Sequence, residues 1–420
     1  MGSTPTRADA ITGVRLLDET TIHFGGVGDC WNMTWAADDR QYGALCDGFG
    51  WPGMPLPTFF SSRMYVFDGT PPDVRFAYLP GYPILPCTLF DDEHHYAYYG
   101  FGTLAVDGRI YQFLSTRNLP REPRFTGAKL IYSDDLGATW HNQDGSTPVV
   151  WETWEERSRA NLVFFREPGE AFNMPTLLQM GKDYAANRDG YVYIYSPNGN
   201  GTDTMRQLVL CRAPKGELLD RASYRYFAGR DGDGTATWSP AIEDRQPVCT
   251  FPEGYVMPLE WRTGTPFALG HEKAEVQPHS WHPSVVYNEG LGVYMMANFG
   301  MGVAPGEHWF SRPSYLGIWV ADEPWGPWRQ IHEDTAWAPA GESAARPYET
   351  RISPKWISDD GRSFWLVWTD FQGAGDQSEV EFMNAFAALL RAGRYEEASE
   401  LQSAAMPYYG FNAQKVEIVM

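Results

Sequence analysis

The chain has 420 residues, a formal net charge of −20 at pH 7, and a composition rich in aromatic residues, Gly and Pro. The negative charge, without any run of Lys or Arg, argues against nucleic acid or an anionic membrane surface as a partner. No apolar run approaches the roughly 18 residues that a membrane-spanning helix needs. Aromatic segments joined by Gly and Pro turns favour an all-β fold of short strands.

The N-terminal stretch MGSTPTRADA lacks the apolar core of a secretion signal. Two interpretations stay open: a cytoplasmic protein, or a secreted protein whose signal has been removed. The cysteines are widely spaced, without a C-x-x-C pair, and their odd number leaves at least one thiol unpaired. We expect a mostly reduced set, made up of Cys30, Cys46, Cys87, Cys211 and Cys249.

One form of hairpin recurs along the chain: a short apolar strand, an acidic or glycine turn, and then an aromatic strand. Copies begin at Thr34, Thr103, Val285 and Pro354, and a further copy from Met174 has a longer turn. Five copies of one unit are typical of a repeat-built fold.

A second, looser hairpin follows each of the first four copies, beginning at Arg63, Ala128, Gln207 and Leu316. Two hairpins make a four-stranded antiparallel sheet, and five such sheets around an axis make a β-propeller. The last unit has a single later strand, GFNAQKVEIV, so we expect TGVRLLDE near the N-terminus to supply the missing strand. The sequence therefore predicts an all-β, five-bladed β-propeller, closed by the N-terminal strand, as one domain over residues 1–420.

A turn in the second unit, SDDLGATW, concentrates hydrogen-bonding groups. Gly137 can adopt positive φ, and Asp side chains accept bonds from turn amides. The spacing of Ser133, Asp135, Gly137, Thr139 and Trp140 resembles the Asp-box of sialidases, which in that family is a folding motif away from the substrate. We expect this turn to be structural and to lie on the face opposite the ligand site.

Residues 378–406 are alone in following helical spacing, with Phe382, Leu389 and Leu390 on one side. They interrupt the last blade between its second and third strands. Two alternatives stay open for this helical insertion: a helix packed on the flank of the propeller, which we favour, or a wall or lid of the pocket.

Polar clusters with neighbouring aromatic residues precede the inner strand of every predicted blade. Because a propeller axis gathers the starts of its inner strands, we expect these clusters to form one pocket. They are Asp29 and Trp31; Glu93, His94, His95 and Tyr98; Glu167, Glu170 and Asn173; His279, Trp281 and His282; and Arg346, Tyr348, Glu349 and Arg351. The ends of the second strands return to the same face and add Asp47, Asn298 and Asp370.

Carboxylates among Trp and Tyr side chains suit carbohydrate, because rings stack on sugars and carboxylates bind hydroxyls or transfer protons. Asp29 is the first catalytic candidate, although an Asp in this place can also cap a turn. Glu170 and Glu349 are the others, with salt bridges as their alternative role. The candidates for binding substrate are Trp31, Asp47, His94, His95, Asn173, Trp281, His282, Arg346 and Arg351.

The five-unit layout and strings such as GDCWNMTWAADDRQYGALCDG and DGYVYIYSPNGNG resemble the five-bladed β-propeller glycosidases of the arabinanase and xylosidase group, and propeller proteins allied to endo-D-arabinanases. The resemblance covers about residues 20 to 370. It implies Asp29 as the base and Glu170 as the acid. The chain departs from that pattern in the second blade, where Glu93, His94 and His95 replace the expected accessory Asp, and in the fourth blade, where histidines appear.

These observations favour a carbohydrate-active enzyme, a glycoside hydrolase that acts on a poly- or oligosaccharide, with Asp29 and either Glu170 or Glu349 as base and acid. One alternative is a polysaccharide lyase with a His or Tyr base, in which Arg346 or Arg351 neutralises a uronic carboxylate. Another is a glycan-binding propeller without turnover.

We expect a carbohydrate ligand and no cofactor. A metal site is not expected either, because His94 and His95 are adjacent and would point to opposite faces of a strand.

Overall fold

The computed structural model describes residues 6–54, 58–85, 98–117, 125–153, 155–200, 202–251, 257–260, 273–276, 281–302, 310–373 and 378–420. Five residues named above lie outside the described residues, namely Cys87, Glu93, His94, His95 and His279.

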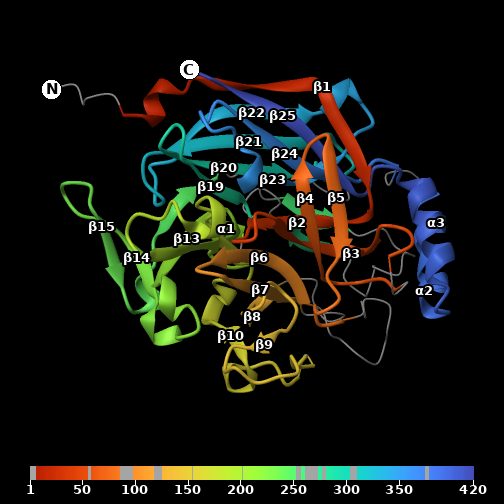
Figure 1. The fold of residues 1–420 in the computed structure, drawn as a ribbon, viewed down its shortest axis with the longest axis horizontal. Coiled ribbons are helices and arrows are strands. Elements are labelled where there is room, and N and C mark those ends of the chain that lie inside the picture. The colour runs from red at the N-terminus through yellow and green to blue at the C-terminus, as the bar shows by residue number, and fades with distance from the viewer. Residues whose placement is uncertain are drawn as a thin grey trace.

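The described strands form five sheets, each of four or more strands, and these are the blades of the propeller (Figure 1). Blade one contains β2 (Val27–Trp35), β3 (Gln41–Gly50), β4 (Arg63–Thr70) and β5 (Asp73–Tyr78). Blade four contains β19 (Ser284–Asn288), β20 (Val293–Gly300), β21 (Ser314–Ala321) and β22 (Arg329–Trp337). Both follow the predicted order of two successive hairpins.

Blades two and three are larger than the repeat predicts. Blade two contains β6 (Tyr98–Val106), β7 (Arg109–Arg117) and β8 (Phe125–Ser133), and its outer edge is shared by β9 (His141–Asn142) and β10 (Val163–Phe165). Blade three contains β11 (Thr176–Leu177), β12 (Tyr191–Pro197), β13 (Gln207–Pro214), β14 (Arg225–Arg230), β15 (Ala236–Ser239) and β16 (Pro247–Thr250). A separate ribbon pairs β17 (Met257–Glu260) with β18 (Lys273–Val276).

Blade five joins the two ends of the chain. Its strands run in the order β1 (Gly13–Gly25), β25 (Phe411–Val419), β24 (Ser363–Asp370) and β23 (Pro347–Ile352). Gly13 pairs with Val419 and Val14 with Ile418 in an antiparallel register, and Figure 1 shows β1 running alongside β25. The predicted closure by the N-terminal strand is therefore confirmed.

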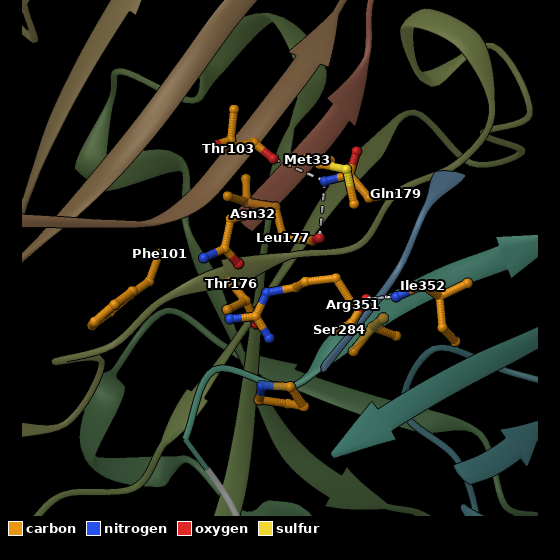
Figure 2. Close-up of a pocket in the computed structure, with 12 residues that line it drawn as sticks. Asn32, Met33, Phe101, Thr103, Thr176, Leu177, Gln179, Ser284, Arg351 and Ile352 are labelled. Carbon is orange, nitrogen blue, oxygen red and sulfur yellow. Dashed lines mark hydrogen bonds between the residues drawn. The ribbon is translucent and has the colours of Figure 1, made fainter. Parts of the chain in front are cut away.

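The innermost strands β2, β6, β11, β19 and β23 form a ring in which each contacts the next. They surround a narrow axial cavity with room for roughly one water molecule, and Figure 2 shows the side chains that line it. Every innermost strand contributes to this lining, through Asn32, Phe101, Thr176, Ser284 and Arg351 among others. The prediction of an all-β, five-bladed β-propeller is confirmed, while its extent as one domain stays a prediction.

Helices are short or late in the chain. α1 (Thr202–Met205) is a single turn, whereas α2 (Ser378–Arg391) and α3 (Tyr395–Ala405) form the predicted insertion between β24 and β25. The two long helices stand at the edge of the molecule in Figure 1, and Phe386 of α2 packs against Phe49 and Phe59 of blade one. No helix of the described residues is long and apolar enough to cross a membrane.

The apolar core lies between neighbouring blades. β2, β6 and β23 are buried along almost their whole length, because a blade packs on both of their faces. In the described part of the chain Cys30, Cys46, Cys211 and Cys249 are free thiols.

Candidate active site

The ends at which the inner strands begin meet in a buried aromatic cluster. It contains Tyr99, Phe101, Phe125, Trp281, Tyr348 and Tyr409, and it also includes Cys30 and Cys46. The residues just named come from blades one, two, four and five. Blade three contributes Met174 to the same cluster. The predicted convergence of inner-strand starts is therefore visible in the packing.

Asp29 lies inside this cluster, with 7% of its surface exposed. Its Oδ2 accepts a hydrogen bond from the Tyr348 hydroxyl at 2.6 Å and lies 3.2 Å from the Tyr409 hydroxyl. Its Oδ1 is buried and has no hydrogen-bond partner among the described residues. A buried carboxylate oxygen without a donor is costly, and such atoms need a functional or solvent explanation.

Charge around Asp29 is predominantly negative. Burial first, and then the carboxylates of Asp47 and Glu349, raise the pKa of Asp29 well above its ordinary value, although the Cys30 thiol and the Tyr348 hydroxyl act in the opposite direction. Asp29 therefore holds a proton more strongly than an ordinary aspartate does.

Glu349, in β23, has the opposite electrostatic environment. Its Oε2 accepts a hydrogen bond from Arg351 Nη2 at 2.5 Å and lies 3.0 Å from His282 Nδ1, and all three side chains are buried. Burial opposes ionisation, but the contacts with His282 and Arg351 prevail and hold the pKa of Glu349 below its ordinary value. Glu349 is thus a fixed negative charge, and the salt bridge considered for it from the sequence is present.

His282 links blade four to this ion pair. Burial lowers its pKa, so the ring is neutral near pH 7, and Phe101 stacks on it with ring centroids 4.0 Å apart. Arg351 Nη2 lies 2.7 Å from His282 Nδ1. An arginine can only donate, so in the neutral ring Nδ1 accepts and Nε2 carries the proton. Nδ1 and Glu349 Oε2 are then both acceptors of the Arg351 guanidinium, which bridges them.

Asp370, at the end of β24, is a second carboxyl with a raised pKa. Burial raises the pKa of Asp370 to about 6. The backbone amides of Arg346 and Gln372 donate to its Oδ1 at 2.7 and 2.9 Å, and these bonds lower the pKa by a smaller amount. Arg346 itself donates through its side chain to the carbonyl of Phe310 at 3.0 Å. The Arg346 side chain is therefore bound to the protein rather than free for a ligand carboxylate.

Glu170, in blade three, stands in a tight turn and is only partly buried. Its Oε2 accepts a hydrogen bond from the Asn200 amide at 2.5 Å. The side-chain amides of Asn200 and Asn173 both donate to the carbonyl of Phe125, at 2.6 and 3.1 Å. Because Phe125 belongs to the aromatic cluster, these bonds fix the blade-three turn against the same end of the axis.

Several site residues have left-handed backbone. Non-glycine residues rarely adopt positive φ, and each costs of the order of 1–2 kcal/mol that the surrounding structure has to offset. The site residues in this conformation are Cys30 (φ 68°), Asp47 (φ 42°), Glu170 (φ 59°) and Glu349 (φ 58°). Strain of this kind is typical of functional sites, where a side chain is aimed at the expense of local backbone energy.

Two predicted binding residues lie deeper than expected. Trp31 is fully buried, and its Nε1 donates to the Thr369 hydroxyl at 3.0 Å. Trp281 is also buried and meets Phe125 edge to face at 5.9 Å. The Trp31 ring is packed within the core in this structure, so we do not include it among the groups proposed to contact a ligand.

The thiols of Cys30 and Cys46 lie beside the acid. Their sulfur atoms and a carboxylate oxygen of Asp29 are all within 4.8 Å of one another. Thiolates and a carboxylate are Zn²⁺ ligands, but burial raises the pKa of both thiols and so disfavours the thiolate form that binds metal. The donor set therefore fits a buried hydrogen-bonded group better than a metal site.

Tyr409 was not predicted from the sequence. It follows the helical insertion and precedes β25, so its position gives no sign of proximity to the axis. The available signal was the polar-aromatic pair Tyr408–Tyr409 immediately before a strand, the pattern that marks the inner strands.

Comparison with known proteins gives limited information beyond the fold. A family described as a domain of unknown function (DUF4185) matches residues 101–262, and no curated protein matches the chain. A putative hydrolase from Bacteroides ovatus ATCC 8483 is similar at 14% identity, with 94% of this chain and 87% of that chain covered and a TM-score of 0.47.

Two further solved structures are similar in the same way. One is a xylan β-1,4-xylosidase from Bacillus halodurans C-125, at 10% identity, with 83% of this chain and 50% of that chain covered and a TM-score of 0.40. The other is the catalytic domain of a GH62 α-L-arabinofuranosidase from Coprinopsis cinerea, at 10% identity, with 100% of this chain and 94% of that chain covered and a TM-score of 0.43. The chain spans half the length of the xylosidase, and likenesses of this degree carry no argument about chemistry.

Proposed function

We propose that the protein is a glycoside hydrolase that acts on a poly- or oligosaccharide, with Asp29 as the general base and Glu170 as the general acid. The observation that carries the proposal is the state of Asp29: one carboxylate oxygen is held by tyrosine, and the other is buried without a partner. A base needs this combination of fixed orientation and a free lone pair.

In the proposed reaction a water molecule gives a proton to Asp29 Oδ1 while its oxygen attacks the anomeric carbon. The glycosidic bond breaks, and the leaving oxygen takes a proton from Glu170. The raised pKa of Asp29 suits this role, because a carboxylate with a higher pKa, once ionised, binds the transferred proton more strongly. Since Oδ1 is covered in this structure, the substrate has to displace the groups that cover it.

Glu349 is less suited to be the acid, because its pKa is lowered and its salt bridge with Arg351 favours the ionised form. We assign it the role of a fixed charge that raises the pKa of Asp29. Asp47 supports the same effect from β3. The buried aromatic cluster around these groups gives the apolar surroundings in which such charge effects are strong.

The proposal is tested by incubating the protein with a panel of plant and microbial polysaccharides and analysing products by mass. We expect hydrolysed oligosaccharides from the wild type and none from Asp29→Asn. The matched control is Asp38→Asn, because Asp38 also accepts from a tyrosine, Tyr42 at 2.8 Å, but in the turn at the far end of the same hairpin.

An Asp29→Asn variant that retains activity would refute the proposed base. Unsaturated products that absorb in the near ultraviolet would instead indicate a lyase, and glycan binding without any product would indicate a binding propeller.

A further inference from the structure

The segment Met406–Gly410 connects the helical insertion to blade five, and we call it the exit segment. It begins directly after α3 and ends where β25 starts. Met406 and Tyr409 belong to the buried aromatic cluster that contains Cys30 and Tyr348. The insertion therefore contributes side chains to the candidate site as well as to the flank of the propeller.

Backbone hydrogen bonds tie the exit segment to two blades. The amide of Gly28, at the start of the inner strand of blade one, donates to the carbonyl of Tyr409 at 3.3 Å. The amide of Asp370, at the end of β24, donates to the carbonyl of Tyr408 at 3.2 Å. The exit segment thus bridges the strand ends that present Asp29 and Asp370.

The Tyr409 hydroxyl lies between two acceptors of blade one. It is 3.2 Å from Asp29 Oδ2 and 3.0 Å from the carbonyl oxygen of Asp47, and the tyrosine is 5% exposed. One hydroxyl proton serves both oxygens, while Tyr348 donates to the same Oδ2 at 2.6 Å. The ring is held in turn by Phe371, edge to face at 5.8 Å.

We infer that Tyr409 is a positioning residue: with Tyr348 it holds Asp29 Oδ2, so that Oδ1 is the oxygen left for proton transfer, and the backbone bonds of the exit segment hold Tyr409 in place. This inference rests on the proposed role of Asp29 as the base. Because Tyr409 is buried behind the carboxylate, its loss acts on Asp29 and not on substrate contacts.

Among the described residues, the groups that face Asp29 and can titrate are Cys30 of β2, Cys46 and Asp47 of β3, Tyr348 and Glu349 of β23, and Tyr409 of the exit segment. Removal of a hydroxyl donor from a carboxylate favours its protonated form, so the apparent pKa of the base rises. The base must be ionised to act, and the acidic limb of the kcat/KM profile then moves to higher pH.

Tyr409→Phe should therefore shift the acidic limb upward and lower kcat several-fold, with KM nearly unchanged. Tyr348→Phe should shift the limb further in the same direction, because its hydrogen bond is shorter and undivided. The matched control is Tyr42→Phe, which removes a tyrosine donor from Asp38 in the distant turn and should leave the limb in place.

A limb that stays at its wild-type position in Tyr409→Phe, while Asp29→Asn is inactive, would overturn the inference and leave the proposed function standing. If no saccharide is turned over, the same comparison is made by following the ¹³C shift of the Asp29 carboxyl against pH, assigned by its loss in Asp29→Asn. An Asp29 titration that is identical in wild type and Tyr409→Phe would equally overturn it.

Discussion

Asp29 and Asp135 are the same residue type at opposite ends of the propeller, and their environments differ in almost every respect. Asp135 is solvated and accepts from the Ser133 hydroxyl at 2.8 Å, the Thr139 amide at 2.8 Å and the Thr139 hydroxyl at 2.7 Å. Burial is the largest single effect and opposes ionisation, but the hydrogen bonds together outweigh it and lower the pKa of Asp135. Asp29 is buried beside like charges, keeps one oxygen unpaired and has a raised pKa.

The distance between the two regions follows from strand direction. β8 begins at Phe125, in the aromatic cluster, and ends at Ser133, where the Asp135 turn starts. From the first to the last of its nine residues, at a rise of about 3.3 Å per residue, the strand spans roughly 26 Å between the cluster and the turn. A satisfied carboxylate stabilises its turn, whereas an unsatisfied one keeps a lone pair available for chemistry.

The largest expected effect is that of Asp29→Asn on turnover. We predict that kcat falls at least about a hundredfold, the usual range for a lost acid or base. The melting temperature should stay the same or rise, because the change removes a buried charge that faces Asp47 and Glu349. Kinetics and calorimetry on one preparation measure the turnover and the melting temperature. A destabilised Asp29→Asn variant with normal turnover would show that Asp29 is a structural residue, as Asp135 is expected to be.

Glu170→Gln should do similar damage on natural linkages, again by about a hundredfold. The loss should shrink for aryl glycosides whose leaving group needs no protonation. Glu167→Gln is the control from the same turn, since Glu167 is buried and paired with Arg221 at 3.1 Å. Equal losses for good and poor leaving groups would argue against Glu170 as the acid.

At the other end of the molecule, Asp135→Ala should lower the free energy of unfolding by about 1 kcal/mol and leave the turnover of folded protein unchanged. Asp134→Ala is the neighbouring control, because its salt bridge with Arg109 is exposed and worth little. Denaturant titration distinguishes the two, and a selective loss of turnover in Asp135→Ala would contradict its placement away from the site.

The smallest effect concerns pH and Asp370. Its folded-state pKa of about 6 lies above the ordinary value, so its contribution to stability is complete below about pH 4 and is lost as the pH rises through 6. Asp370→Asn keeps the Oδ1 acceptor and should melt above wild type at pH 7.5, with no difference near pH 4. A difference that is constant with pH would show that Asp370 does not titrate in this way.

The sequence predicted the parts of the structure that depend on local patterns. Hairpins with an aromatic second strand identify the blades, and the incomplete last blade indicates closure by the segment TGVRLLDE, most of which lies in β1. Asp29 and Glu349 were chosen as candidates because each lies near the start of an inner strand, and their catalytic roles stay predictions. The packing between blades could not be predicted, since the pairing of Glu349 with His282 joins segments that are distant in the sequence.

Trp31 shows the same limit. Two residues after Asp29 it was expected to share the ligand side, but the strand changes register between Asp29 and Asn32, with Cys30 in a left-handed conformation. The irregularity breaks the alternation of side chains and turns the indole into the core, where it contacts Phe411 of blade five. Tyr409 was missed because the helical insertion, rather than a strand repeat, brings it to Asp29.

The most direct test of the account uses a saccharide that the wild-type protein cleaves. The saccharide is digested in H₂¹⁸O, and the products are analysed by mass. Hydrolysis with Asp29 as the base predicts one ¹⁸O atom at each new reducing end with wild type, and no labelled product with Asp29→Asn. Unlabelled products that carry a double bond, or equal labelling by Asp29→Asn, would contradict it.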